Sequence, residues 1–152
     1  GLLHIDLDGN DYYIWNEINV IDPIIVIAEY NGIFGKDRPL SVIYDKNFNR
    51  NDAHYSNLLF GSSIKSLYQL ADEKGYSFIG CNSGGNNAYF VRKDKLNDIV
   101  RSVSLEDGFI ESQYRESRNE NGNLSFLNKI EAKSLLKGTP VYNTETQEIE
   151  KF

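Results

Sequence analysis

The sequence predicts an α/β domain whose mostly parallel sheet ends in an antiparallel hairpin. Three observations support this prediction. A strand-like run over residues 2–7, a helical pattern and a second apolar run over 24–30 follow one another in the order of a β–α–β unit. The second run is apolar on both faces, as parallel strands covered by helices are. Two further strand patterns, 76–82 and 88–92, flank a link rich in Gly and Asn, which is typical of a hairpin.

The elements between these strands are predicted from periodicity and turn chemistry. After the first strand, residues 8–11 provide turn and helix-capping side chains, and Ile14, Trp15 and Ile18 then share one helical face that ends before Pro23. A second helix begins at Ser62 or Ser63 and ends at Gly75. A short strand is expected within 40–44 and a last helix over 127–136, while 102–123 is expected to run over the surface.

The segment from residue 45 to residue 57 is rich in Asn and Asp and lacks a periodic pattern. A connection of this length inside a compact domain is usually functional or mobile, so we expect it to be a lid or a substrate-contact segment. The chain divides into an α/β part over 1–100 and a polar extension with a short helix over 101–152. Because it opens directly on a strand, we expect a piece of a longer protein.

Charge and composition restrict the classes of partner. The formal net charge is -6, and a broad basic surface for nucleic acid is therefore not expected. No apolar run reaches the roughly 18 residues needed to span a bilayer, so no membrane contact is expected. The single cysteine, Cys81, cannot form an internal disulfide, which favours a reducing compartment; we predict a cytoplasmic protein.

Polar side chains follow both predicted parallel strands at the point where each strand ends. The first set is Asp6, Asp8, Asn10 and Asp11, and the second is Glu29 and Asn31. Because ligands bind at the carboxyl ends of the strands in open parallel sheets, these groups are predicted to form one rim. Three hairpin residues join them if the hairpin is a neighbouring element of the sheet: Asn82, Asn86 and Asn87. The simpler interpretation is that the first set only caps the N-terminus of the following helix. One cap, however, needs only one side-chain oxygen, and the first set supplies several.

These residues resemble the middle of the FkbM-type methyltransferases, a family within the class I methyltransferases. The resemblance lies in Ile5-Asp6-Leu7-Asp8-Gly9, the helix after it, and the run from Pro23 to Glu29. The later helix and the strands up to Phe90 match the antiparallel end of the class I methyltransferase sheet. The resemblance covers about residues 1–95 and implies a three-layer αβα, Rossmann-like fold. It also implies that the complete domain binds S-adenosylmethionine and transfers the methyl group to a hydroxyl of a sugar or small metabolite.

The chain departs from the family pattern in three respects. Asp8 stands where the family usually has Glu, and Asn10 and Asp11 are additional. The first three strands of the sheet and their glycine-rich nucleotide loop are missing. The glycine pair Gly84-Gly85 lies in the hairpin link and does not lead from a strand into a helix. The chain thus corresponds to the C-terminal half of the domain, and any activity belongs to a longer parent chain or has been lost.

The resemblance and the residue chemistry together assign roles to the rim. Asp6 is the cofactor contact, and Asp8 and His54 are the catalytic candidates, His54 because imidazole titrates near neutrality and suits a general base. The acceptor, a small molecule, is expected to contact the remaining polar side chains: Asn10, Asp11, Glu29, Asn31 and Asn82.

Other sites and functions remain open at this level. A calcium loop over residues 6–17 lacks its turn glycine and the preceding helix, whereas Mg²⁺ held by Asp8, Glu29 and Asn31 is chemically sensible and resembles catechol-type methyltransferases. Cys81 is interpreted as a buried small side chain. The rival functions are a non-catalytic binding or assembly module that dimerises through an open sheet edge, and a carbohydrate or sugar-nucleotide enzyme that uses strand-end carboxylates.

Overall fold

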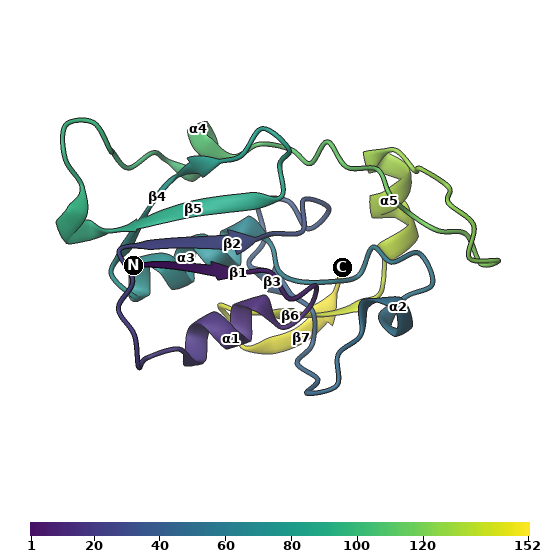
Figure 1. Cartoon of the computed structure of the whole chain (residues 1–152). Coiled ribbons are helices and arrows are strands. Elements are labelled where there is room, and N and C mark those ends of the chain that lie inside the picture. Colours follow the sequence, from purple (N-terminus) through teal and green to yellow (C-terminus); the bar gives the residue numbers. More distant parts are fainter.

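A computed structural model describes all of residues 1–152, arranged as a mixed four-stranded sheet and a smaller antiparallel sheet with short helices around them (Figure 1). The strands are β1 (Leu2–Ile5), β2 (Ile25–Glu29), β3 (Leu40–Ser41), β4 (Tyr76–Cys81), β5 (Asn87–Arg92), β6 (Pro140–Asn143) and β7 (Glu148–Lys151). The helices are α1 (Asp11–Glu17), α2 (Arg50–Ala53), α3 (Ile64–Glu73), the 3-10 helix η1 (Lys93–Lys95), α4 (Leu105–Gly108) and α5 (Lys129–Leu136).

The first sheet has the strand order β1-β2-β5-β4. The β1–β2 pair is parallel, and the predicted β–α–β unit and the predicted β4–β5 hairpin are both confirmed. The prediction of a mostly parallel sheet is wrong, because β5 lies antiparallel between β2 and β4. One of the three strand pairings is therefore parallel. Strand β1 lies at the end of the sheet, and its second edge pairs with no strand of this chain.

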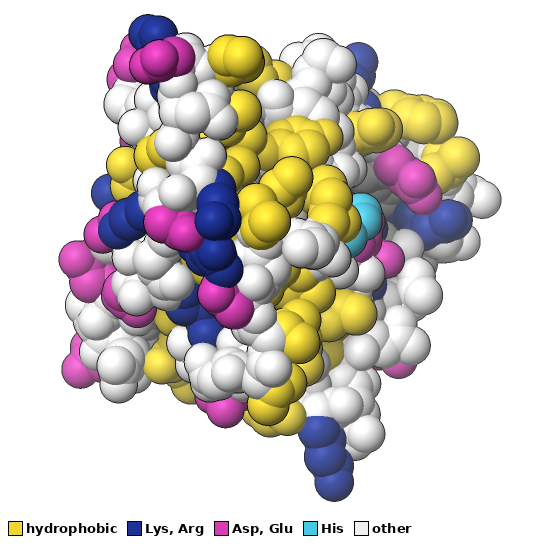
Figure 2. All heavy atoms as spheres, turned by 60° about the vertical axis from the view of Figure 1, so that its left-hand side comes forward, with side chains coloured by type: hydrophobic (Ala, Val, Ile, Leu, Met, Phe, Trp, Pro, Cys, Tyr) yellow, Lys and Arg dark blue, Asp and Glu magenta, His cyan; other side chains and the backbone are white.

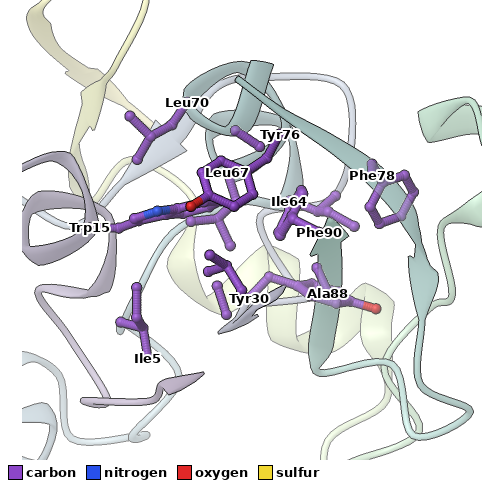
Figure 3. Close-up of a cluster of buried hydrophobic side chains, with 13 residues drawn as sticks. Ile5, Trp15, Tyr30, Ile64, Leu67, Leu70, Tyr76, Phe78, Ala88 and Phe90 are labelled. Atoms are coloured by element: carbon purple, nitrogen blue, oxygen red, sulfur yellow. The ribbon is translucent and has the colours of Figure 1, made fainter. Parts of the chain in front are cut away.

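One face of this sheet packs against α1 and α3 and forms the main core (Figure 3). Alternate strand residues such as Val26 and Phe90 point to this face, where they meet Trp15 of α1 and Leu67 of α3. All four side chains are at most 2% exposed. Burial of a large apolar side chain contributes about 1.5–3 kcal/mol, so this cluster, rather than helix propensity, holds the two helices in place.

The opposite face of the sheet is less covered. Leu2 of β1 is 59% exposed, and Ile25, Ile27 and Tyr89 are only partly buried. A continuous band of apolar side chains runs over the side of the molecule that carries the N-terminus (Figure 2). The helical layer formed by α1 and α3 lies on the core face of the sheet.

Local chemistry sets the ends of the longest helix as predicted. The Ser63 hydroxyl accepts a hydrogen bond from the backbone N–H of Ser66 and caps α3. Gly75 follows the helix with φ of 83°, a conformation that glycine adopts without a Cβ penalty. Helix α1 is shorter than its pattern indicated and ends at Glu17, before the exposed residues 19–22.

The second sheet, in the order β3-β6-β7, was not expected from the sequence. Gly138 and Pro140 were interpreted as a helix stop, and they are also the entry to the β6–β7 hairpin, since proline is tolerated as the first residue of a strand. Leu40 and Val141 lie in its core with Leu136 of α5. The pairing of β3 with β6 crosses the predicted division at residue 100.

The longest helix, α3, has 10 residues. No helix combines the length and the apolar character that crossing a bilayer requires.

Candidate functional site

The polar residues singled out in the sequence gather at one rim of the first sheet, where β1 and β2 end. Ile5 pairs with Ala28, so the residues that follow both strands emerge side by side. Glu29 pairs with Asn87 of the antiparallel β5, which places the β4–β5 turn at the same rim. The structure thus brings together the two strand-end sets and the hairpin residue Asn82.

Asp11 builds the turn between β1 and α1. Its side chain is fully buried, and its two carboxylate oxygens accept hydrogen bonds from the backbone N–H groups of Leu7 at 2.8 Å and Gly9 at 2.9 Å. Burial is the largest influence on the pKa of Asp11 and raises it, while these bonds oppose the rise. Both oxygens are therefore engaged in holding the turn.

The side chains of Asn31 and Asn82 are likewise engaged by backbone groups. The Asn31 amide is 1% exposed and donates hydrogen bonds to the carbonyl oxygens of Leu58 and Phe60. The Asn82 side-chain oxygen accepts three backbone N–H bonds within the β4–β5 turn. Each amide fixes a loop at the rim, and neither oxygen is left free for a ligand.

Asp6, Asp8 and Asn10 are the strand-end residues of β1 with accessible side chains. Asp6 is exposed. Asp8 has a φ of 54°, in the left-handed region, and its carboxylate lies 2.6 Å from the Arg50 guanidinium. Asn10 donates a hydrogen bond to the Asp45 carbonyl oxygen, while its own side-chain oxygen is buried without a partner.

Glu29 is the most perturbed acid of the rim. Burial, which is the largest cause, and the carboxylates of Asp6, Asp8 and Asp11 together raise its pKa to about 8, with Arg50 opposing them. Its Oε2 atom is buried without a hydrogen-bond partner. At neutral pH the Glu29 carboxyl group is mostly protonated, whereas an ordinary glutamate is ionised.

The segment over residues 45–57 closes on the β1–α1 turn through three contacts. Besides the Arg50–Asp8 ion pair and the Asn10–Asp45 hydrogen bond, the Phe48 ring lies on Gly9. A Cβ atom on Gly9 would come within 2.2 Å of the Phe48 ring, so any side chain larger than hydrogen there would require the ring to move. The segment predicted to contact substrate is therefore fixed beside the strand ends.

A cavity of about 680 Å³ opens between this segment and the end of β1. Its lining is predominantly polar: Leu7, Asp8, Lys46, Asn47, Phe48, Asn49, Arg50, Asn51, Asn57, Glu116 and Arg118. Amide and charged side chains with one aromatic ring are able to bind a hydroxyl-rich molecule through hydrogen bonds and ring contact. Of the two catalytic candidates, Asp8 lines this cavity.

His54 does not line the cavity. Its Nδ1 atom lies 2.7 Å from the Ser56 hydroxyl, and its ring stacks on Tyr55 at 4.5 Å between centroids. Burial lowers the pKa of His54, because it disfavours the charged form of the ring. Its nearest polar partner is therefore a residue of its own loop.

A strap formed by residues 109–118 crosses the rim above the β4–β5 turn. The Tyr30 hydroxyl donates to the Ile110 carbonyl oxygen, and the Gln113 N–H donates to that of Gly84. A Cβ atom on Gly85 would lie 2.3 Å from the Glu111 carbonyl oxygen. The Gly84-Gly85 turn is thus occupied by the strap and offers no loop for a nucleotide phosphate.

The residues fit the expected cofactor only in part. Asp6, the expected cofactor contact, is exposed and directly follows the last residue of β1. No three acidic, imidazole or thiol side chains converge closely enough to hold a metal ion. The Mg²⁺ arrangement moreover needs the Asn31 side-chain oxygen, which already accepts a hydrogen bond from the Ile33 N–H.

Sequence reasoning overlooked Arg50. Arg50 joins three elements: its guanidinium contacts Asp8, donates to the Asn57 carbonyl oxygen and lies 3.8 Å from the centre of the Phe60 ring. The only available signal was a lone arginine within a segment rich in Asn and Asp. Asn87 was expected at this rim if the hairpin is a neighbour of β2, and its pairing with Glu29 confirms this.

Comparisons of the chain with known protein families, with curated proteins and with solved structures find no match.

Proposed function

We propose that the chain is the C-terminal half of a Rossmann-like, three-layer methyltransferase domain that transfers a methyl group to a hydroxyl of a sugar or small metabolite. The strand order of the first sheet is the observation that supports this best. A parallel pair, β1 and β2, is followed by an antiparallel β5 inserted between β2 and the edge strand β4. This is the antiparallel end that the sequence resemblance led us to expect.

Two further features support a partial domain. The outer edge of β1 is unpaired, and the face of the sheet opposite α1 and α3 is apolar and partly exposed. Parallel strands usually have both faces covered by helices, because their connections cross over the sheet. Additional parallel strands beside β1 and helices on this face would complete the three layers.

The polar cavity beside Asp8 is the proposed acceptor site. S-adenosylmethionine, when bound by the complete domain, supplies the methyl group, and Asp6 is the side chain of this chain placed to contact it. The residues here position the acceptor: the Arg50–Asp8 pair fixes one wall, and the Asn and Arg side chains of residues 46–57 supply hydrogen bonds to it. Holding the acceptor in line and excluding water accounts for much of the catalysis in such a transfer.

The test is calorimetry of S-adenosylmethionine binding by the full product of the gene, with the 152-residue chain measured in parallel. We expect binding by the full product, and weaker or no binding by the chain alone. A full product that carries no glycine-rich loop ahead of Gly1 and binds no S-adenosylmethionine contradicts the proposal.

An assembly module is the second candidate, favoured by the unpaired edge of β1 and the exposed Leu2. Unpaired strand edges pair readily with another chain. Light scattering on the 152-residue chain distinguishes the two candidates. A stable dimer that Leu2→Lys converts to a monomer supports assembly, and a monomer at all concentrations tested argues against it.

A further inference from the structure

The chain contains two Asn-Gly steps, Asn31-Gly32 and Asn121-Gly122, and they lie in opposite environments. Asn31 is 1% exposed just after β2. Asn121 and Gly122 are exposed at the tip of a loop that projects beyond α5 at the right of Figure 1. A Cβ atom built on Gly122 meets no atom within 4 Å. One step is therefore enclosed by the protein, and the other is open to solvent.

An Asn-Gly step has a reactivity of its own. The backbone nitrogen of the glycine attacks Cγ of the asparagine side chain, the Cγ–Nδ2 bond breaks, and ammonia leaves with the proton that the backbone nitrogen gives up. Water then opens one of the two C–N bonds of the resulting succinimide ring and returns a proton to the nitrogen. The product is aspartate, or isoaspartate, in which the backbone runs through the side-chain carbonyl carbon. Glycine favours the ring closure, because it has no Cβ atom to hinder the approach.

The hydrogen bonds around the two steps oppose this reaction to very different degrees. The Asn31 amide donates to two carbonyl oxygens and its side-chain oxygen accepts the Ile33 N–H, so Cγ is held by three buried bonds. At the loop tip the bonds converge on Asn119: its side-chain oxygen accepts the Asn121 N–H, and its carbonyl oxygen accepts the Gly122 N–H at 2.8 Å. The Asn121 side-chain amide takes no part in these bonds. Attack on it requires the opening of one exposed bond, and exposed loop tips open at little cost in free energy.

We propose that Asn121 is a site of spontaneous deamidation, and that its conversion to isoaspartate displaces the Arg118 guanidinium from the wall of the polar cavity. The Arg118 Nη1 atom donates a hydrogen bond to the Gly122 carbonyl oxygen at 3.0 Å, and Arg118 is part of the cavity lining. The Arg118 backbone N–H is fixed separately, by the Ser56 carbonyl oxygen. The modification therefore moves the side chain and leaves the backbone at residue 118 in place. The site does not depend on the proposed methyl transfer.

The displacement follows from the longer backbone of isoaspartate. The turn is closed at a fixed spacing, because the Asn119 N–H donates to the Asn123 carbonyl oxygen at 2.9 Å and the Gly122 N–H donates back to the Asn119 carbonyl oxygen. Isoaspartate inserts one additional methylene group into the backbone between these bonds. The Gly122 carbonyl oxygen moves as the turn adjusts, and Arg118 loses the acceptor that holds its guanidinium.

The modification is tested on the 152-residue chain, incubated in mildly alkaline buffer, which favours loss of the glycine N–H proton. Mass spectrometry of its tryptic peptides follows the two steps separately. We expect the Asn121 peptide to gain the mass difference between –NH2 and –OH, in two chromatographic forms, at least about tenfold faster than the Asn31 peptide. In urea, where both steps are unfolded, the two peptides should react at similar rates. Equal rates in the folded chain, or an Asn121 peptide that stays unchanged, overturn the proposal.

The effect on the cavity wall is measured by NMR on the arginine Nε–H signals of the isoaspartate form. We expect the Arg118 signal to shift and that of Arg50, which lines the same cavity but lies outside the loop, to stay in place. Asn121→Gln, incubated in parallel, should keep its mass and both signals, because the longer side chain closes a ring poorly. Asn121→Asp adds the charge without lengthening the backbone and should leave the Arg118 signal near its original position. An unchanged Arg118 signal in the isoaspartate form, or an equal shift in Asn121→Asp, contradicts the displacement by the longer backbone.

Discussion

The Arg50 guanidinium lies 2.6 Å from the Asp8 carboxylate and so connects the turn after β1 to a segment 42 residues further along the chain. The same guanidinium donates to the Asn57 carbonyl oxygen at 2.7 Å and rests on the Phe60 ring. One side chain therefore spans the turn, the cavity wall and the loop that leads to α3.

Replacing Arg50 with Ala should loosen the cavity wall more than it destabilises the fold. Asp8 is 55% exposed on its side chain, so the ion pair is screened by solvent, and the loss is expected to be about 1 kcal/mol in the free energy of unfolding. Hydrogen exchange of residues 46–57 should increase. Lys46→Ala is the control, because Lys46 lines the same cavity but has no ion-pair partner within 4.0 Å. Equal rates of hydrogen exchange over residues 46–57 in Arg50→Ala and Lys46→Ala would contradict the proposal that Arg50 holds the cavity wall.

Asp11→Ala should destabilise the fold by about 3 kcal/mol, because two backbone N–H groups lose a charged acceptor in a buried turn. Urea denaturation followed by Trp15 fluorescence measures this loss, since Trp15 is 2% exposed in the core. The neighbouring exposed carboxylate gives a matched control: Asp6→Ala should change stability by less than about 0.5 kcal/mol. A mild effect of Asp11→Ala would mean that capping, rather than the buried turn, is its main role.

The Glu29 carboxyl group should make the protein less stable as the pH rises. Its pKa is about 8 in the folded chain against 4.5 in the unfolded chain, so between these values the folded state holds a proton that the unfolded state has lost. Below pH 4.5 Glu29 is protonated in both states, and its contribution to the free energy of unfolding is fully present. This contribution is lost as the pH rises from 4.5 to 8. Because the side chain is partly exposed, we expect a loss of about 2 kcal/mol between pH 6 and pH 9, smaller than the full shift implies. Urea denaturation of the wild type and Glu29→Gln at both pH values measures it, and a loss of the same size in the variant would refute the assignment.

Gly85→Ala should displace the strap at residues 111–113. The new Cβ atom would lie 2.3 Å from the Glu111 carbonyl oxygen, and the glycine also has a φ of 72°. Gly122 has a similar φ of 79° and no atom within 4 Å of an added Cβ, so Gly122→Ala reports the backbone strain alone. Gly122→Ala is expected to cost about 1 kcal/mol, and Gly85→Ala at least about 1 kcal/mol more. Faster exchange of the Gln113 amide in Gly85→Ala only would confirm that the strap has moved.

Much of the first sheet was predictable, because its signals are local. The apolar run ending at Glu29, the cap at Ser63 and the stop at Gly75 all act within a few residues, and each element lies close to its predicted position. The convergence of the strand ends followed from the parallel pairing of β1 with β2. The second sheet was missed, because β3 pairs with β6 about 100 residues later and has only two residues.

The site shows the same division. The sequence by itself determined which polar side chains follow the strands, since alternation and turn chemistry place Asp8 and Glu29 at strand ends. Only the tertiary structure decided what each of them does. Asp11 and Asn82 are bound by the backbone of their own turns and Asn31 by the carbonyl oxygens of Leu58 and Phe60, whereas Glu29 keeps an oxygen without a partner. The physical reason is that hydrogen-bond satisfaction and burial depend on contacts between distant segments, such as Arg50 against Asp8 and Asn87 against Glu29, and a residue pattern specifies side-chain chemistry without specifying its neighbours.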